Sequence, residues 1–173
     1  MAGLLAAGAL VCSANIRELA ISNGATDQQR IQPAVLNNGT MVFVWEDQSG
    51  ADSEVKFRMF NPFSSQFFNI TTVNADSAGD QVDPVVAATA DGGFAVAFAS
   101  RPTGGDYDVK FRRFNFTGAA VDAADIPVNF ALAGDQQHPD ITRLANGNLV
   151  IAFAGPGDHA QDLFYRRFDT AGT

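Results

Sequence analysis

Three short segments of unbroken apolar residues recur along the chain, and each follows a tight-turn sequence. They are Met41–Trp45, Phe94–Phe98 and Leu149–Phe153. An Asn-Gly or Asp-Gly pair and one further residue precede each segment, a pattern typical of the turn that enters a β-strand. Because every residue of these strands is apolar, both strand faces must be covered. The pattern therefore predicts sheets that pack face to face.

Each apolar segment belongs to a longer repeat. A polar lead that ends in proline comes first, in Asp27–Pro33, Gly79–Pro84 and Gly134–Pro139. A short strand follows each proline, in Ala34–Leu36, Val85–Ala87 and Asp140–Thr142. After the apolar segment and a polar loop comes a third strand, in Glu54–Asn61, Asp108–Asn115 and Asp162–Asp169. These third strands begin 54 residues apart each time, the size of a four-stranded propeller blade.

The chain does not begin with the first strand of a repeat or end with the fourth. Phe67–Asn74 and Asp125–Asn129 end in an asparagine ten residues before the next proline, and Ile16–Asn23 has the same spacing to Pro33. The chain thus starts with a fourth strand and ends after a third. We expect the first strand to complete the last blade, which would remove an exposed sheet edge. Residues 1–15 are then a connector, and a signal peptide over Met1–Ala14 is the alternative.

These features predict an all-β fold of antiparallel four-stranded blade-like repeats, three copies in a β-propeller-like arrangement, with a β-sandwich as the alternative. The predicted single domain spans 1–173, with the connector at 1–15 and repeats at 16–74, 75–129 and 130–173. Three blades make a very tight ring. We therefore expect the chain to pair with a second copy into six blades, to join a larger assembly, or to be part of a longer array.

Charge and composition narrow the class of partner. The 173 residues carry a net charge of -8, which argues against nucleic acid or an anionic membrane as a partner. Cys12 is the single cysteine, so no internal disulfide framework and no zinc site is predicted. The apolar N-terminal run is too short to span a bilayer.

The loops after the three apolar strands differ between repeats, and loops on a rigid scaffold commonly carry recognition. The predicted ligand-binding residues are Trp45, Asp47, Asp52, Arg101, Asp106, Tyr107, Asp158 and His159. Asp and Gly together also suit Ca²⁺ binding through oxygen atoms, yet no segment follows a known calcium-loop pattern. Solvated turn residues are the favoured interpretation, with no cofactor and Ca²⁺ as the alternative.

Two recurring polar positions have a structural interpretation. Arg58, Arg112 and Arg166 stand at one position of the third strand, beside phenylalanines. We expect each to stack on the aromatic rings and to pair with an acid of the next blade, rather than to bind a ligand. The asparagines that end the fourth strands (Asn23, Asn74 and Asn129) are expected to cap a corner near the Asp-Gln pairs of the leads.

No catalytic motif stands out. The chain has no nucleophile elbow, histidine pair or phosphate loop. Thr89–Phe94 partly resembles the Asp-box turn of sialidase propellers, but it occurs once and lacks the later aromatic residue. The sequence therefore predicts that the chain is not an enzyme, and a propeller-type glycoside hydrolase is the least favoured alternative.

Several short sequence segments resemble the repeats of large secreted bacterial proteins that also carry RTX calcium-binding or adhesin modules. They are Gly79–Gln81, Asp91–Val96, Arg112–Asn115 and Val128–Asn129. The resemblance implies propeller-like blades and an extracellular, acidic, non-catalytic role. We accordingly predict a binding or adhesion module at the cell surface, in the periplasm or outside the cell, which presents its loops to a glycan, surface or protein partner. A structural subunit of a larger assembly is the alternative.

Overall fold

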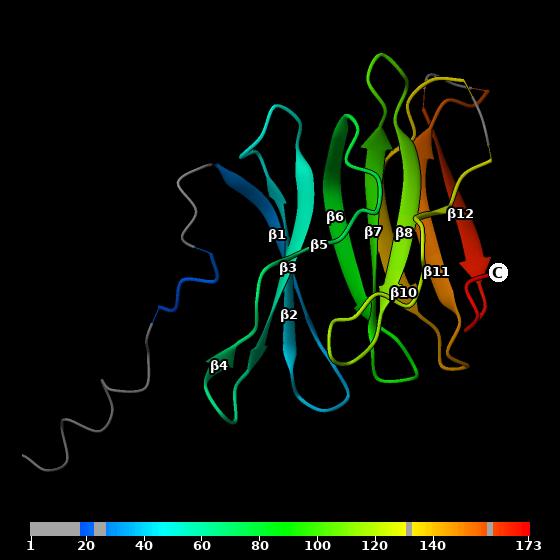
Figure 1. Cartoon of the computed structure of the whole chain (residues 1–173). Helices are drawn as coiled ribbons and strands as arrows, with labels where there is room; N and C mark the ends of the chain where they lie inside the picture. Colours follow the sequence, from blue (N-terminus) through cyan, green and yellow to red (C-terminus); the bar gives the residue numbers. More distant parts are fainter. Residues whose placement is uncertain (1–17, 23–26, 131–132, 159–160) are drawn as a thin grey trace, which may run out of the picture.

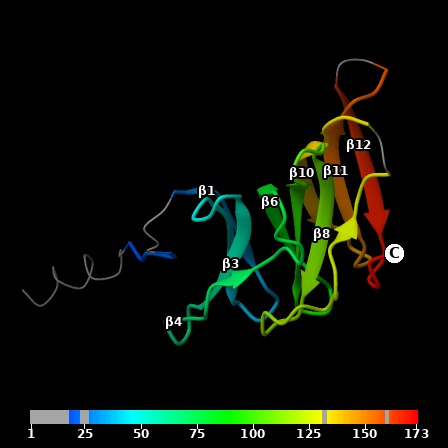
Figure 2. The same ribbon diagram turned by 45° about the horizontal axis from the view of Figure 1, so that its top comes forward.

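The computed structural model describes residues 18–22, 27–130, 133–158 and 161–173. They form three antiparallel sheets that lie side by side (Figures 1 and 2). Within these ranges no helix is long and apolar enough to cross a membrane. The predicted connector at 1–15 lies outside the described residues, as do Cys12, Asn23 and His159.

Each sheet corresponds to one predicted repeat. The first contains β1 (Gln28–Val35), β2 (Met41–Asp47), β3 (Glu54–Asn61), β4 (Gln66–Phe67) and β5 (Thr71–Thr72). The second contains β6 (Asp80–Ala88), β7 (Phe94–Arg101), β8 (Asp108–Phe114) and β9 (Ile126–Pro127). The third contains β10 (Gln137–Arg143), β11 (Leu149–Gly155) and β12 (Asp162–Phe168). The antiparallel all-β prediction is confirmed, and three sheets packed in series replace the alternative of a two-sheet sandwich.

The middle strands are the most deeply buried part of the fold, as predicted. In β7, Phe94–Ala99 are all 0% exposed. One face of the second sheet joins a cluster with the first sheet, in which the rings of Phe57, Phe94 and Phe114 meet at centroid distances of 5.0–5.1 Å. The other face packs on the third sheet through Ala95 and Ala97. Small side chains at this junction let the sheets approach closely.

The first strand of each blade lies beside the first strand of the next, so β1, β6 and β10 form the inner side of the arc. These strands begin earlier than predicted, because the polar leads are strands and not loops. Each contains a β-bulge, which accommodates Pro84 in β6 and Pro139 in β10. The bulge in β1 falls at Arg30 and Ile31, so Ile31 and not Pro33 is equivalent to these prolines.

The recurring arginines join neighbouring blades. Arg112 donates to the Val73 carbonyl oxygen at 2.9 Å, and Arg166 donates to that of Val128 at 3.2 Å. Each therefore reaches back to the fourth strand of the preceding blade. The predicted stacking on aromatic rings is confirmed, for example Arg166 over Phe130 at 4.7 Å. The predicted pairing with an acid of the next blade is wrong, because the partner is a backbone carbonyl.

The prediction that the N-terminal strand completes the last blade is also wrong within one chain. The third sheet has three strands, and the order ends at β12. Residues 18–22 lie instead beside the first blade, where Arg58 donates to the Ile21 carbonyl oxygen at 2.7 Å. The two ends of the arc are therefore far apart (Figure 1). One copy of the chain forms an open arc.

Candidate active site at the inner side of the blades

Three charged or titratable side chains from three different blades meet at the inner side of the arc. Arg30 forms an ion pair with Asp83, and Nδ1 of His138 lies 2.9 Å from Oδ2 of the same aspartate. The Asp83 side chain is 9% exposed, whereas those of Arg30 and His138 are 57% and 60% exposed. Asp83 is thus a carboxylate held in place by two flanking groups that face solvent.

These three residues are equivalent, since each stands at the bulge of its blade's first strand. Their φ angles are 55°, 55° and 56°, in the left-handed region. That region is uncommon for residues other than glycine and costs about 1–3 kcal/mol for each residue. Non-glycine residues held this way concentrate at functional sites. Three such residues in contact at one place make this the strongest site candidate among the described residues.

A second carboxyl group reaches the same cluster. Glu46, near the end of β2, is 4% exposed, and its Oε2 lies 3.8 Å from Nε of Arg30. Its Oε1 accepts a hydrogen bond from the Gln48 side chain at 2.8 Å. Among the described residues, no group donates a hydrogen bond to Oε2. Arg30 therefore lies between two carboxyl groups, those of Glu46 and Asp83.

The cluster opens into a hollow of about 260 Å³, lined by Arg30, Gln32, Asp83–Val85, His138 and Pro139. A second hollow of about 270 Å³ shares Arg30 and is lined also by Trp45 and by Ile21. Trp45 is 2% exposed, and its Nε1 has no hydrogen-bond partner among the described residues. The two hollows therefore adjoin each other at Arg30.

The predicted binding residues are distributed differently from this cluster. Trp45 lines the second hollow, but Asp47 is 5% exposed and is held by Lys56 at 3.2 Å and by the Ser49 backbone. Burial raises the pKa of Asp47, but the hydrogen bonds from Ser49 and Lys56 leave it below its usual value. Asp47 is therefore a structural anion and not a residue presented by the loop.

The other predicted loop residues form contacts at the ends of the blades. Asp52 and Asp106 accept hydrogen bonds from the backbone of Gly79 and Gly134 in the following blade, at 3.2 and 2.8 Å. Arg101 pairs with Asp80, and its guanidinium lies 4.6 Å from the centre of the Tyr107 ring. The hydrogen bond from Arg101 lowers the pKa of Asp80. Asp158 is exposed, and the binding role of all these residues stays a prediction.

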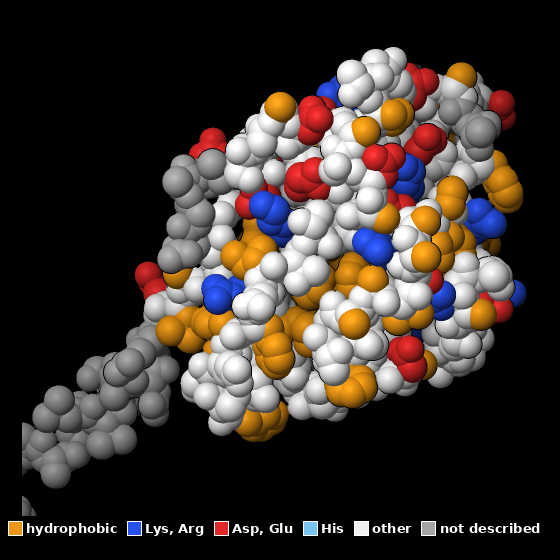
Figure 3. All heavy atoms as spheres, in the orientation of Figure 1, with side chains coloured by type: hydrophobic (Ala, Val, Ile, Leu, Met, Phe, Trp, Pro, Cys, Tyr) orange, Lys and Arg blue, Asp and Glu red, His pale blue; other side chains and the backbone are white. Residues whose placement is uncertain are grey.

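Sequence reasoning missed Arg30, Glu46, Asp83 and His138. The signal was present in part, because Asp83 and His138 each precede a proline of the repeat. Acidic side chains also gather toward the upper end of the face in Figure 3, where the loops after β2 and β7 lie. Among the described residues, no group of three or more His, Cys, Asp or Glu could hold a metal ion.

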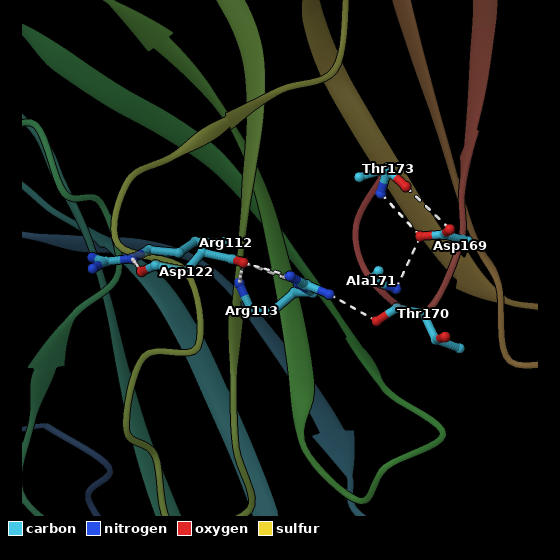
Figure 4. Close-up of polar contacts among 7 residues, drawn as sticks. All are labelled: Arg112, Arg113, Asp122, Asp169, Thr170, Ala171 and Thr173. Carbon is cyan, nitrogen blue, oxygen red and sulfur yellow. Dashed lines mark hydrogen bonds and ion pairs between the residues drawn. The ribbon is translucent and has the colours of Figure 1, made fainter.

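A further hollow, of about 280 Å³, lies at the opposite end of the second and third blades. The guanidinium of Arg113 lines this hollow and is already held by other groups of the chain. Arg113 pairs with Asp122 and donates to the Thr170 carbonyl oxygen at 2.7 Å (Figure 4). Asp169 caps the adjoining turn through the backbone of Ala171 at 2.9 Å. This arrangement links two blades, and we assign it a structural role.

The fold resembles that of several solved carbohydrate-active enzymes. The α-L-arabinofuranosidase of Fusarium graminearum matches with a TM-score of 0.63 and 14% identity over 81% of this chain and 45% of its own. The α-L-arabinanase of Penicillium chrysogenum, complexed with arabinobiose, gives the same values. The endo-arabinase of Bacteroides thetaiotaomicron matches with a TM-score of 0.54 and 14% identity over 85% and 58%. No protein-family model and no curated protein sequence matches the chain.

These likenesses support a β-propeller-like fold, of which the described residues form three sheets in series. The chain spans about half the length of the solved structures it matches. The neighbours overturn two predictions from the sequence, that the chain is a non-catalytic binding or adhesion module and that it is not an enzyme. The glycoside hydrolase alternative, disfavoured because no motif stands out, agrees better with them.

Proposed function

We propose that this chain is a domain of a propeller-type glycoside hydrolase and that Glu46, Asp83, Arg30 and His138 belong to its active site. One observation carries the proposal. Two carboxyl groups from different blades flank one arginine beside a hollow, in a fold shared with arabinan-degrading enzymes. Hydrolysis of a glycosidic bond generally uses such a pair, one carboxyl group as acid and the other as base or nucleophile.

The contacts suggest how the two carboxyl groups divide these roles. Asp83 is engaged by Arg30 and His138, which fix its orientation, so it suits the base or nucleophile. Oε2 of Glu46 accepts no hydrogen bond from the described residues, so this carboxyl group is assigned the remaining role of the acid. Arg30 would hold the sugar through its exposed guanidinium.

The neighbours suggest the substrate class. Their names refer to arabinofuranose polymers and to arabinobiose, so α-L-arabinofuranosyl linkages are the first choice for this chain. The two hollows that share Arg30 would accept adjoining sugar units. A polymeric substrate of this kind favours an extracellular or cell-surface location, in keeping with the acidic composition of the chain.

The test is sugar release by the full chain from arabinan, from arabino-oligosaccharides and from aryl α-L-arabinofuranosides. We expect release by the wild type and a loss of about 10²-fold or more in kcat for Asp83→Asn and for Glu46→Gln. Asp169→Asn is the matched control, because the equivalent residues Asn61 and Asn115 are asparagines at the other end of their blades. A wild type that releases no sugar, or site variants as active as the control, would refute the proposal. Near-ultraviolet circular dichroism confirms that each variant is folded.

A further inference from the structure

The hollow that adjoins the carboxyl cluster at Arg30 contains a polar group that the chain itself does not use. Its walls are formed by Ile21, Ser22, Gln28–Ile31 and Trp45. The Trp45 side chain is buried, and its Nε1 has no hydrogen-bond partner among the described residues. A buried N–H without an acceptor costs about 1–3 kcal/mol. The fold therefore carries an unsatisfied donor on a residue that lines a hollow of about 270 Å³.

The equivalent positions of the other blades show that packing does not require this N–H. By strand register, Trp45 of β2 is equivalent to Phe98 of β7 and to Phe153 of β11. Both phenylalanines are buried in the core clusters between the sheets. Phenylalanine supplies a large aromatic ring without a polar group. The indole N–H is therefore a feature of the first blade alone among the three, which points to recognition and not to packing.

The charges beside this hollow favour an uncharged ligand. Among the described residues that line it, Arg30 alone is charged. The Arg30 guanidinium is already balanced by Asp83, with which it forms an ion pair, and lies 3.8 Å from a carboxyl oxygen of Glu46. A cation would be repelled by the guanidinium, and an anion by the two carboxyl groups that accompany it.

The remaining groups define the polar and apolar parts of the ligand. The indole N–H and the guanidinium of Arg30 can only donate hydrogen bonds, so the ligand must carry acceptor oxygens. Ile21, Ile31 and the aromatic ring of Trp45 supply apolar walls. A pocket with apolar walls and a few polar groups fits a ligand of mixed character. An uncharged molecule with several acceptor oxygens and C–H surfaces is a sugar unit.

One wall of the hollow can adjust to such a ligand. Residues 18–22 belong to no strand. Arg58 donates to the Ile21 carbonyl oxygen at 2.7 Å, and the Gln28 side chain donates to the Ser22 hydroxyl at 2.8 Å. Movement of this segment therefore leaves every strand pairing intact. It gives an acceptor atom a way to the buried indole N–H while β2 stays in place.

We propose that this hollow binds the sugar unit next to the one at the carboxyl cluster, and that the Trp45 N–H donates to an oxygen of that unit. Trp45 is then a specificity-determining residue, because a ligand confined to the hollow beside Asp83 and His138 does not reach it. The proposal rests on the proposed function for the kind of sugar, an arabinofuranosyl unit. That the ligand is an uncharged sugar follows from the residues of the hollow itself.

The first test uses the single tryptophan of the chain as the reporter. Thio-linked arabinobiose, which resists hydrolysis, is titrated into the wild-type chain while tryptophan emission is recorded. We expect a saturable change, with half-saturation about tenfold below that for arabinose, which fills one hollow at a time. Sodium sulfate should leave the emission unchanged. No change with the disaccharide, or an equal change with sulfate, would overturn the proposal.

This measurement separates the proposal from the hydrolase function on which it draws. A saturable change in emission from a wild type that releases no sugar would support sugar binding in this hollow and refute the hydrolase. Sugar release without any change in emission would support the hydrolase and refute the role of Trp45.

The second test removes the donor and keeps the aromatic ring. Trp45→Phe carries the residue of the other two blades, and calorimetry should show about 5- to 10-fold weaker affinity for thio-linked arabinobiose. Ile31→Phe narrows the same hollow from an exposed position and should weaken binding as well, so the test does not depend on the folding of one variant. Phe116→Leu, at an exposed aromatic residue outside the hollow, is the control and should keep the wild-type affinity. Wild-type affinity in folded Trp45→Phe, or equal losses in all three variants, would contradict the proposal.

Discussion

Asn129 and Gln136 form a buried pair in which the asparagine amide donates to Oε1 of the glutamine at 2.9 Å. The same asparagine accepts from the backbone N–H of Val109 at 2.7 Å and donates to Asp108 at 2.7 Å. One side chain thus ties the fourth strand, the third strand and the start of the next blade. Asn74 and Gln81 repeat the arrangement one blade earlier.

Replacement of Asn129 by alanine should destabilise the fold by about 3 kcal/mol, because it removes the buried hydrogen bonds with Gln136 and with the Val109 N–H, which no other described group accepts. Denaturant unfolding followed by tryptophan fluorescence measures the loss. Asn37→Ala is the control at an exposed turn position and should change stability by less than about 0.5 kcal/mol. Equal losses for the two variants would contradict the structural role of the corner.

Arg113 and Asp122 should behave as a coupled pair. Arg113→Met should cost about 3 kcal/mol, since it leaves a 9% exposed aspartate without its cation. Methionine itself fits the position, because Met59 stands there in the first blade and packs on Gly118 as Arg113 packs on Gly172. Asp122→Ala in the Arg113→Met background should therefore recover part of the loss, in a double-mutant cycle with about 1–3 kcal/mol of coupling. Additive losses would contradict the pairing.

Ala97 and Ala152 allow a comparison between a sheet face that a neighbouring blade covers and one that faces solvent in the described part of the chain. They occupy equivalent positions in β7 and β11, but Ala97 is 0% exposed and Ala152 is exposed. Ala97→Leu should cost about 1–3 kcal/mol by overpacking. Ala152→Leu should change the stability of a single chain by less than about 0.5 kcal/mol. Denaturant unfolding of the two variants measures the difference, and equal losses would contradict the covered position of Ala97.

Asp91 should contribute to the loss of stability in acid. The hydrogen bond from the Thr89 hydroxyl lowers the pKa of Asp91, and this effect outweighs burial, which raises it. A carboxyl group whose pKa is lower in the folded state stabilises the fold above its unfolded value of 3.8, and this stabilisation is lost as the pH falls through the folded pKa. The melting temperature of Asp91→Asn should fall less steeply than that of the wild type between pH 5 and pH 2. Parallel curves would contradict this assignment.

The parts of the fold with strict apolar patterning were predictable. The bounds predicted for the third strand of the first repeat, Glu54–Asn61, are those of β3, because its polar and apolar residues alternate from Glu54 to Met59. The first strands were predicted too short. Their leads are polar, and Pro84 and Pro139 argue against a strand unless a bulge is foreseen.

The candidate site was not predictable, because it depends on properties that no single repeat encodes. A left-handed backbone at Arg30 cannot be read from its residue type, because arginine seldom adopts that conformation. The contact between Arg30 and Asp83 joins residues of different blades, and the proline of the first repeat suggested an alignment two residues out of place. The equivalence of Arg30, Asp83 and His138 therefore emerged only from the strand registers.

At the three bulges that carry Arg30, Asp83 and His138, the backbone conformation is the same although the side chains differ in chemistry. The backbone fixes where the residue stands, and a cation, an anion and an imidazole already occupy the same place in successive blades. Substitutions there should therefore alter what the inner side of the arc recognises while the sheets around it stay intact. The side chain at each bulge can therefore be exchanged separately, and the ligand preference that we propose for this domain can be changed one blade at a time.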